Sequence, residues 1–579
     1  MSDFGREPVQ IIEIDQTFCG LEYGVGDCEA AIGVTGNRKC YNTFSTCQDR
    51  LNFLKEFLTL RFVTKGSNIP KEWNAIPSLV NVSTTPTVLN IGGRSGNSGP
   101  LGTRAALTAT FQDHPDGDIF TDPYLNDRDF DPIERSTFWA KWLARNKFYK
   151  NRAIRLYEGY IGQSLAEMQV KHYVIETIEG PSNGSVTIKA YDVLRLADDD
   201  KAQAPSQSTG VLTASLNDSA TSFKVAGAVL ADYPAPGTVR INDELISYSA
   251  VALDGDDVEF TVTSRGTDGT EADSHDEGDS VQLCLRYTDQ DVWLVIQDLL
   301  ENYAGVNPDF IPIADWTEEG ETWLESFEVT TLITEPTGVL TLLNEISEQC
   351  LVYIWWDERR QEIRLRSVRA PTEQPVLLND TANILEGSFA KREDPNDLRT
   401  QIWFYYQPRN ATEIGRDQDF RNAIIRRDAD AESENEHDES RIKKIYSRWL
   451  RTGAQVTVTL TRLLDQFRDP SVYSKFSMDA KDRGVWTGDI VDIDTRDFVN
   501  DTGAREPKRY IIISADEVES GHRVNYEALE YEFITGNGAF WMAEDAPDYS
   551  AASDSEKEAG AWWSDEDGLI DGDEGYVWQ

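Results

Sequence analysis

Alternating apolar and polar positions predict short β-strands along much of the chain. A period of two is typical of strands that bury one face. It occurs in Ala105–Phe111, Ser185–Tyr191, Val456–Thr461, Asp489–Asp494 and Ala528–Phe533, and Ile402–Tyr406 and Tyr510–Ile513 form apolar runs of strand length. Repeated short strands of this kind predict barrel-like or sandwich-like units.

Helical spacing occurs at fewer places. Apolar residues recur at three- and four-residue intervals in Asp49–Phe62, Thr137–Tyr149, Val292–Leu300 and Val339–Cys350, which predicts four amphipathic helices. Pro336 is placed to lie in the first turn of the last one. A predicted hairpin follows it, with strands Val352–Trp356 and Glu362–Arg366. The predicted fold class is therefore multidomain and mainly β, with α+β parts.

Turn-rich and polar stretches divide the chain into six predicted parts. These are a cysteine-rich region at 1–86, a first barrel-like domain at 87–208, an inserted small β module at 209–284, an α+β domain at 285–385, a second barrel-like domain at 386–535 and an acidic, aromatic tail at 536–579. The module is predicted from alternating runs separated by Asp254-Gly255 and Asp268-Gly269, which are hairpin-type dipeptides.

Composition and charge narrow the functional classes. Apolar residues make up 40% of the 579 residues, enough for several packed cores. No window approaches the roughly 20 apolar residues of a membrane span, and the first ten residues have no apolar signal core, so we expect a soluble protein made in a cytosol. The net charge of −46 opposes any role in wrapping DNA, which needs a basic surface. It fits high solubility, a saline habitat or a wall that DNA passes without binding.

The C-terminal tail combines many acidic residues with several aromatic ones. From Trp541 onward it holds twelve acidic residues and one lysine, Lys557, interspersed with Trp562, Trp563 and Trp578. This composition predicts a segment that becomes ordered only on a partner. We expect its aromatic residues to dock on a neighbouring protein or subunit.

Four of the six cysteines fall within the first fifty residues. Eight residues separate Cys19 from Cys28, eleven separate Cys28 from Cys40, and six separate Cys40 from Cys47. Structural zinc sites usually pair ligands two to four residues apart, and no histidine lies nearby. Iron–sulfur clusters need four thiolates and tolerate longer loops, and the intervening glycines and the adjacent Arg38 and Lys39 suit one. An iron–sulfur cluster, disulfides or free thiols, and zinc all stay open on this evidence.

The remaining candidate sites are weaker. His114 could bind a cation together with Asp113, Asp116 and Asp118, although a turn stabilised by Asp side chains is the favoured interpretation. The glycine-rich Asn90–Gly102 is better explained as a flexible loop than as a phosphate cradle. Cys284 and Cys350 are predicted to be small core residues. The chain contains no Walker, H-E-x-x-H or Rossmann motif and no G-x-S-x-G nucleophile elbow, since the match GPSNG at 180–184 precedes a predicted strand and not a helix. We therefore expect a protein that is not an enzyme.

Several stretches resemble the baseplate hub and tail-tip proteins of long-tailed, siphovirus-type phages. They include LGTRAALTATFQDHPDGDIFTDPY, INDELISYSA, TTLITEPTGVLTLLNEISEQC, YIWWDERRQEIRLR and FSMDAKDRGVWTGDIVDIDT, and in this order they cover roughly residues 10–535. The Cys19–Cys47 segment resembles the cysteine region of the lambda minor tail protein L family. The first and last cysteine spacings agree with that family and the middle one is shorter; in that family the region ends a separate protein.

The resemblance implies a structural virion protein at the tail tip, assembled in the host cytoplasm. It implies a homotrimeric ring that closes the tail tube and contacts the distal tail protein, the tape measure protein and the central tail fibre, with a lumen through which DNA passes without specific binding. It also implies a 4Fe-4S cluster held by Cys19, Cys28, Cys40 and Cys47, with zinc as the alternative metal. The alternative functions are a receptor-binding tail adhesin and a tail-associated polysaccharide-degrading enzyme, although no 20–50-residue repeat typical of the latter is present.

Overall fold

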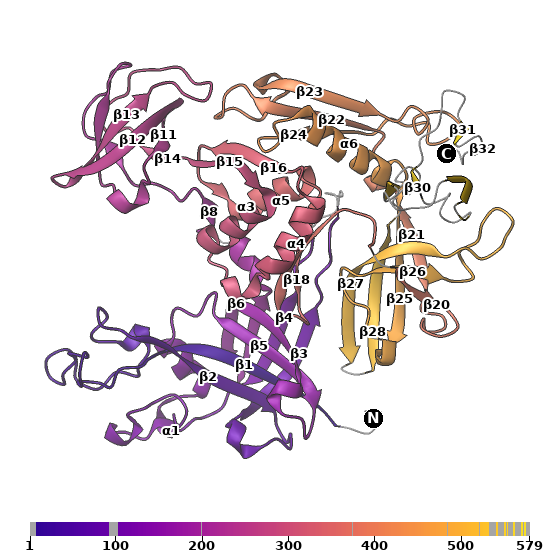
Figure 1. Ribbon diagram of the computed structural model, residues 1–579. Coiled ribbons are helices and arrows are strands. Elements are labelled where there is room, and N and C mark those ends of the chain that lie inside the picture. Colours follow the sequence, from indigo (N-terminus) through magenta and orange to yellow (C-terminus); the bar gives the residue numbers. More distant parts are fainter. Residues whose placement is uncertain are drawn as a thin grey trace.

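The computed structural model describes a mainly β molecule built of several sheets (Figure 1). The described residues are 7–91, 102–198, 200–372, 374–482, 484–519 and 522–531, together with short pieces at 540–541, 549–551, 553, 560–561, 569–570 and 573–574. No helix in these ranges is long and apolar enough to cross a membrane.

A closed seven-stranded barrel forms the N-terminal part. Its strand order is β1-β2-β3-β4-β7-β6-β5. The strands are β1 (Pro8–Cys19), β2 (Lys55–Thr64), β3 (Ile76–Thr85), β4 (Ala106–Gln112), β5 (Ala153–Tyr160), β6 (Gln169–Ser182) and β7 (Ser185–Tyr191). β2 and β3 run parallel, and the other neighbours are antiparallel. Three strands come from before residue 86, so the boundary predicted at that position falls inside the barrel.

Helix α2 (Phe138–Arg145) packs its aromatic side chains into the barrel core. Trp139 is fully buried, stacks on Phe62 with ring centroids 5.3 Å apart, and lies 4.9 Å from the ring of Phe111. The short helix α1 (Pro132–Arg135) precedes it. The sequence predicted α2 within Thr137–Tyr149, and its apolar stripe is the face that the barrel buries.

The helix predicted over Asp49–Phe62 is wrong. Residues from Lys55 onward form strand β2, which pairs with β1 from Ile11–Val63 to Cys19–Lys55. The apolar residues that suggested a helix face do not share a buried face, since Leu51, Leu54 and Phe57 are 99%, 50% and 61% exposed. Backbone pairing with β1, which no local pattern records, decides the conformation here.

A separate six-stranded sheet makes up the β module, with order β14-β11-β12-β13-β10-β9. Its strands are β9 (Val211–Leu212), β10 (Ser222–Ala226), β11 (Gly237–Ile241), β12 (Glu244–Asp254), β13 (Asp257–Ser264) and β14 (Gln282–Leu283). Just before the module β8 (Gln203–Ala204) pairs with β17 (Thr337–Gly338), which lies well after it. The module is therefore an insertion, and it projects from the rest of the molecule (Figure 1).

The largest hydrophobic core joins an α+β unit to a three-stranded sheet. The α+β unit contains β15 (Leu285–Asp291), α3 (Val292–Asp298), α4 (Ile313–Trp323), β16 (Glu328–Ile333), α5 (Val339–Gln349), β18 (Val352–Asp357) and β19 (Glu362–Ser367). The three-stranded sheet contains β22 (Gln401–Pro408), β23 (Phe420–Arg427) and β24 (Ile442–Tyr446), and α6 (Gly453–Phe467) packs on it. The predicted helices at Val292 and Val339 and the hairpin that follows α5 are present.

The strand predicted at Val456–Thr461 is also wrong, because these residues form part of helix α6. The alternation of Val and Thr imitates a strand. A capping box decides otherwise: the Thr452 hydroxyl accepts a hydrogen bond from Gln455 N–H at 3.3 Å, and the Gln455 amide oxygen accepts one from Thr452 N–H at 3.1 Å. Val456 and Leu460 then lie one turn apart on the buried face.

The last large element of the described fold is an open six-stranded sheet with order β20-β26-β27-β28-β25-β21. Its strands are β20 (Val376–Asn379), β21 (Ala390–Asp394), β25 (Ser471–Asp479), β26 (Ile490–Asp494), β27 (Lys508–Glu519) and β28 (Arg523–Glu530). The described pieces of the tail form β29 (Phe540–Trp541), β30 (Gly560–Ala561), β31 (Leu569–Ile570) and β32 (Asp573–Glu574). The predicted strands at Asp489, Tyr510 and Ala528 correspond to β26, β27 and β28, although this sheet is not a closed barrel in the described residues.

Candidate functional site: the cysteine segment

Residues 20–54 form an irregular excursion that we call the cysteine segment. It leaves the barrel after Cys19 in β1 and returns at Lys55, the residue paired with Cys19 at the start of β2. Its only regular element is a single 3-10 turn at Phe44–Thr46. Both ends are fixed to the barrel rim, because Cys19 N–H donates to Asn42 O at 2.7 Å and Gly20 N–H donates to Leu54 O at 3.0 Å.

The fold brings the four predicted cysteines into one region, and all four are free thiols. Cys19 and Cys40 are buried, and Cys28 and Cys47 are half-buried. Asn42 links the two buried ones: its side-chain amide donates to Cys19 O at 3.1 Å, and its Oδ1 accepts from the Cys40 thiol at 3.3 Å. Cys28 packs against the small apolar group that contains Cys40.

The thiols also influence one another electrostatically. Burial raises the pKa of the Cys40 thiol, and the neighbouring Cys47, Cys28 and Cys19 raise it further. Burial likewise raises the pKa of Cys47, to which Cys19 and Cys28 contribute. Negative charge on neighbouring cysteines thus disfavours ionisation of Cys40 and Cys47, and four thiolates in this region need a compensating positive group.

A buried arginine, Arg128, holds the cysteine segment against the loop that precedes α1. Its guanidinium donates to Lys39 O at 2.7 Å and to Cys40 O at 2.8 Å. The same group pairs with the buried Asp122, with Nε 2.7 Å from Oδ2. Lys39 pairs in turn with Asp127 at 2.8 Å. Arg128 therefore fixes the backbone around Cys40, and the acids Asp122 and Asp127 balance the charges of the two cations.

Tyr124 and two left-handed glycines shape the rest of the segment. The Tyr124 hydroxyl accepts a hydrogen bond from Tyr23 N–H at 2.7 Å. Gly24 and Gly26 have φ angles of 72° and 62°, a conformation that L side chains rarely adopt. These residues let the chain between Cys19 and Cys28 turn back on itself, which brings Cys28 toward Cys40.

The four thiols lie in one region but are not arranged around a metal ion. In the described part of the chain, no group of three or more His, Cys, Asp or Glu side chains is arranged to hold one metal ion. Zinc lies about 2.3 Å from each sulfur ligand, so its four thiolates crowd together, whereas a cluster spans a larger volume. A cluster at this segment would depend on the four neighbouring free thiols and on the turns at Gly24 and Gly26.

The cation site considered at His114 does not form. Asp118 is buried between Lys141 and Arg145, with oxygen–nitrogen distances of 2.8 and 2.7 Å. Although burial opposes it, hydrogen bonds from these two cations hold the pKa of Asp118 below its usual value. Asp113 Oδ1 accepts hydrogen bonds from the backbone of Trp139 and His114. The acids thus stabilise a turn, as the favoured interpretation predicted.

The other predicted residues have structural surroundings or lie outside the described ranges. Cys284 packs with Leu245 and Leu332, and Cys350 is fully buried in the largest core. Burial raises the pKa of Cys284 to about 12, so it stays a thiol at neutral pH. Most of Asn90–Gly102 lies outside the described residues. Sequence reasoning missed Asn42, Arg128 and Asp122. The hydrogen bonds by which Arg128 reaches Lys39 and Cys40 span 89 and 88 residues, and Asp122 acts through Arg128.

Comparison with known proteins gives distant structural likenesses only. No protein-family model matches the sequence, and no curated protein matches it. Among solved structures, the 43 kDa tail protein of prophage MuSo2 from Shewanella oneidensis is 9% identical, with a TM-score of 0.33, and the match covers 78% of this chain and 98% of that one. A chain of a native gene transfer agent virion is 12% identical, with a TM-score of 0.30, over 58% of this chain and 92% of that one.

A third likeness is to the c3393 protein of E. coli, a component of the type VI secretion system described as structurally similar to phage T4 tail proteins gp27 and gp5. It is 8% identical, with a TM-score of 0.30, and the match covers 79% of this chain and 75% of that one. At TM-scores and identities this low, the likenesses do not establish a shared fold or function.

Proposed function

We propose that this chain is a structural subunit of a phage-type tail tip, acting as a baseplate hub in the virion. The observation that supports this most is the order of its units. A barrel interrupted by a cysteine segment is followed by an inserted β module, an α+β unit and a second large sheet. This is the order in which the sequence resembles hub and tail-tip proteins of long-tailed phages.

The proposed subunit acts as one of three in a ring that closes the tail tube. The first barrel and the open six-stranded sheet β20-β26-β27-β28-β25-β21, which we call the second sheet, supply its intersubunit contacts. The ring contacts the distal tail protein, the tape measure protein and the central tail fibre. A net charge of −46 gives such a ring an acidic lumen. Like charges repel at short range, so DNA would slide through without binding. The role is structural rather than catalytic.

We further propose that Cys19, Cys28, Cys40 and Cys47 together hold one 4Fe-4S cluster, with zinc as the alternative metal. When bound, the cluster would cross-link four points of the cysteine segment. The segment needs such a link because its apolar group is small: Tyr23, Ala30 and Cys40, together with Tyr124 from outside the segment and with Cys28 packed against them. Ordering a glycine-rich chain costs conformational entropy, and metal binding offsets that cost.

Iron and acid-labile sulfide in protein purified without oxygen test the cluster. We expect about four of each per chain and a brown colour with broad absorption near ~400 nm. Cys28→Ser and Cys40→Ser should remove both, while the matched controls Cys284→Ser and Cys350→Ser should keep them. Stoichiometric zinc without iron or sulfide, or a Cys19–Cys28 disulfide in fresh virions, would contradict the cluster.

Immunoelectron microscopy of negatively stained virions tests the hub. Antibody raised against this chain should label the end of the tail, next to the tube. Label on distal fibres would support the adhesin instead. Depolymerisation of host polysaccharide by the purified chain would support the enzyme.

A further inference from the structure

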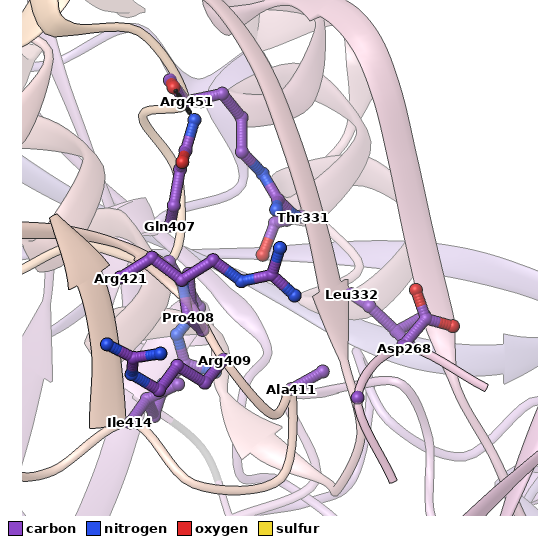
Figure 2. Close-up of a pocket in the computed structure, with 12 residues that line it drawn as sticks. Asp268, Thr331, Leu332, Gln407, Pro408, Arg409, Ala411, Ile414, Arg421 and Arg451 are labelled. Carbon is purple, nitrogen blue, oxygen red and sulfur yellow. Dashed lines mark hydrogen bonds between the residues drawn. The ribbon is translucent and has the colours of Figure 1, made fainter. Parts of the chain in front are cut away.

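A basic pocket opens between the β module and the three-stranded sheet (Figure 2). Its volume is about 340 Å³, and four of its twelve lining residues are arginines: Arg409, Arg421, Arg448 and Arg451. The protein as a whole has 101 acidic and only 55 basic residues. A concentration of arginines at one hollow is therefore contrary to the general charge of the surface.

The pocket is built where the inserted module contacts the body of the molecule. Gly269 of the module has a φ of 89°, and a Cβ added there would lie 1.9 Å from Arg409 O. Ala411 N–H donates to Asp268 O at 3.2 Å. β16 contributes Thr331 and Leu332 to the opposite wall. Backbone contacts thus hold the module, at Asp268 and Gly269, against the loop that contains Arg409 and Ala411, so the pocket is a fixed feature of the fold.

Two of the nearby carboxylates are already paired. Asp268 binds Arg286, with Oδ2 2.6 Å from Nη2. Glu345 binds Arg448, with Oε2 3.0 Å from Nε. Each acid thus forms its ion pair with Arg286 or Arg448 and with none of Arg409, Arg421 and Arg451.

Three arginines of the pocket have no carboxylate partner within the described residues. Arg451 and Arg409 each donate through Nε to a backbone carbonyl, of Thr330 at 2.7 Å and of Phe420 at 3.0 Å. Their terminal nitrogens bond to no described residue, and Arg421 forms no hydrogen bond or ion pair with any of them. Figure 2 shows the Arg421 side chain extending across the middle of the pocket toward the strand of Thr331 and Leu332.

Crowding of these cations has an electrostatic consequence. Burial lowers the pKa of Arg451, and Arg286 and Arg421 lower it further, against the opposing effect of Asp268. A carboxylate placed in the pocket would relieve this repulsion. Guanidinium groups bind carboxylates through two parallel hydrogen bonds, which favours such a ligand in shape as well as charge.

We propose that this arginine pocket binds the carboxylates of an acidic peptide, namely residues 565–579 of a second copy of this chain. That segment, DEDGLIDGDEGYVWQ, has six acidic and no basic residues. Its apolar side chains suit the non-polar part of the wall, Leu332, Pro408 and Ile414. The proposal rests on the proposed function only in requiring several copies of the chain in one assembly.

Binding between copies follows from the position of the pocket. Figure 1 draws the described pieces β31 and β32 on the side of the molecule opposite the β module, whereas the pocket adjoins the module. A neighbouring subunit can present the segment at a high effective concentration, which free nucleic acid lacks.

Fluorescence anisotropy with a labelled peptide of residues 565–579 and the full-length chain tests the proposal. We expect saturable binding that weakens with added salt. Arg409→Ala combined with Arg421→Ala should weaken it about tenfold or more, equivalent to losing about 1.4 kcal/mol. Both side chains are exposed, so the variant should melt at the wild-type temperature.

The matched control is Arg496→Ala combined with Arg523→Ala, two exposed arginines outside the pocket, which should bind the peptide as the wild type does. A peptide with each Asp replaced by Asn and each Glu by Gln should not bind. Equal affinity of the two double variants would overturn the proposal. So would displacement of the peptide by inorganic phosphate or single-stranded DNA at equal concentration. Neither result would bear on whether the chain is found at the tail tip, so the two proposals can fail separately.

Discussion

The cysteine segment interrupts the first barrel between β1 and β2, but the two regions are stabilised by different interactions. The barrel encloses twenty buried apolar residues, with Trp139 and Trp142 among its largest. The segment has four, one of them a cysteine, and leaves Val34 and Leu51 83% and 99% exposed. Apolar burial stabilises the barrel, whereas the segment depends on hydrogen bonds, ion pairs and, in our proposal, a metal cluster.

This difference shows how one chain can attach an irregular excursion to a rigid scaffold. The ends of the segment are set by the Cys19–Lys55 pair of the barrel, and its middle is held by Arg128. Damage to the barrel core should therefore unfold both regions. Damage to the contacts of the segment should release the segment alone.

Trp139→Ala should have the largest effect, because it removes the side chain in the middle of the barrel core. Truncating a buried tryptophan costs about 3–5 kcal/mol of unfolding free energy. We expect unfolding at a lower urea concentration. We also expect the backbone amides of β1–β7 to lose their protection from hydrogen exchange at the same time. The matched control Leu51→Ala removes an exposed side chain of the segment and should change the unfolding free energy by less than about 0.5 kcal/mol. Equal effects of the two variants would refute the contrast.

Arg128→Met should have the next largest effect and a local one. It removes the hydrogen bonds to Lys39 O and Cys40 O and leaves Asp122 buried without its partner. Breaking a buried pair in this way costs about 3 kcal/mol. Limited proteolysis should then cleave within residues 20–54 first. Cleavage that begins in the barrel strands would show that the two regions are not energetically separate.

Glu358→Gln should have a smaller effect and should stabilise the protein. Glu358 lies near Lys171 of barrel strand β6. Burial raises the pKa of Glu358 to about 7 from 4.5, and nearby Lys171 opposes the shift. The folded protein therefore binds the extra proton between pH 4.5 and about 7, and stability falls as pH rises through that window. We expect the variant to be more stable than the wild type at pH 8, by less than about 3 kcal/mol. The gain should vanish near pH 4, and a gain independent of pH would contradict the buried-charge explanation.

The sequence predicted the parts of the fold that local patterns determine. α2, α5 and β7 follow from apolar periodicity, and the module follows from its turn dipeptides. β2 was misread as a helix because its conformation depends on pairing with β1. α6 was misread as a strand, although Thr452 and Gln455 were a readable capping signal.

The candidate site was predictable to the same limited extent. The four cysteines are recognisable from their clustering in the sequence. The residues that hold them are not, because Arg128 reaches Lys39 and Cys40 only in the folded structure, and Asp122 acts through Arg128. The arginine pocket had no sequence signal at all, since its lining residues lie between 268 and 451 on separate elements.

A three-dimensional reconstruction of the virion tail by electron cryomicroscopy tests the proposed function most directly. We predict three copies of this chain around the tail axis at the tip, with the first barrel and the second sheet at the subunit contacts. Copies of the chain away from the tail axis, or a tip that lacks it, would contradict the account.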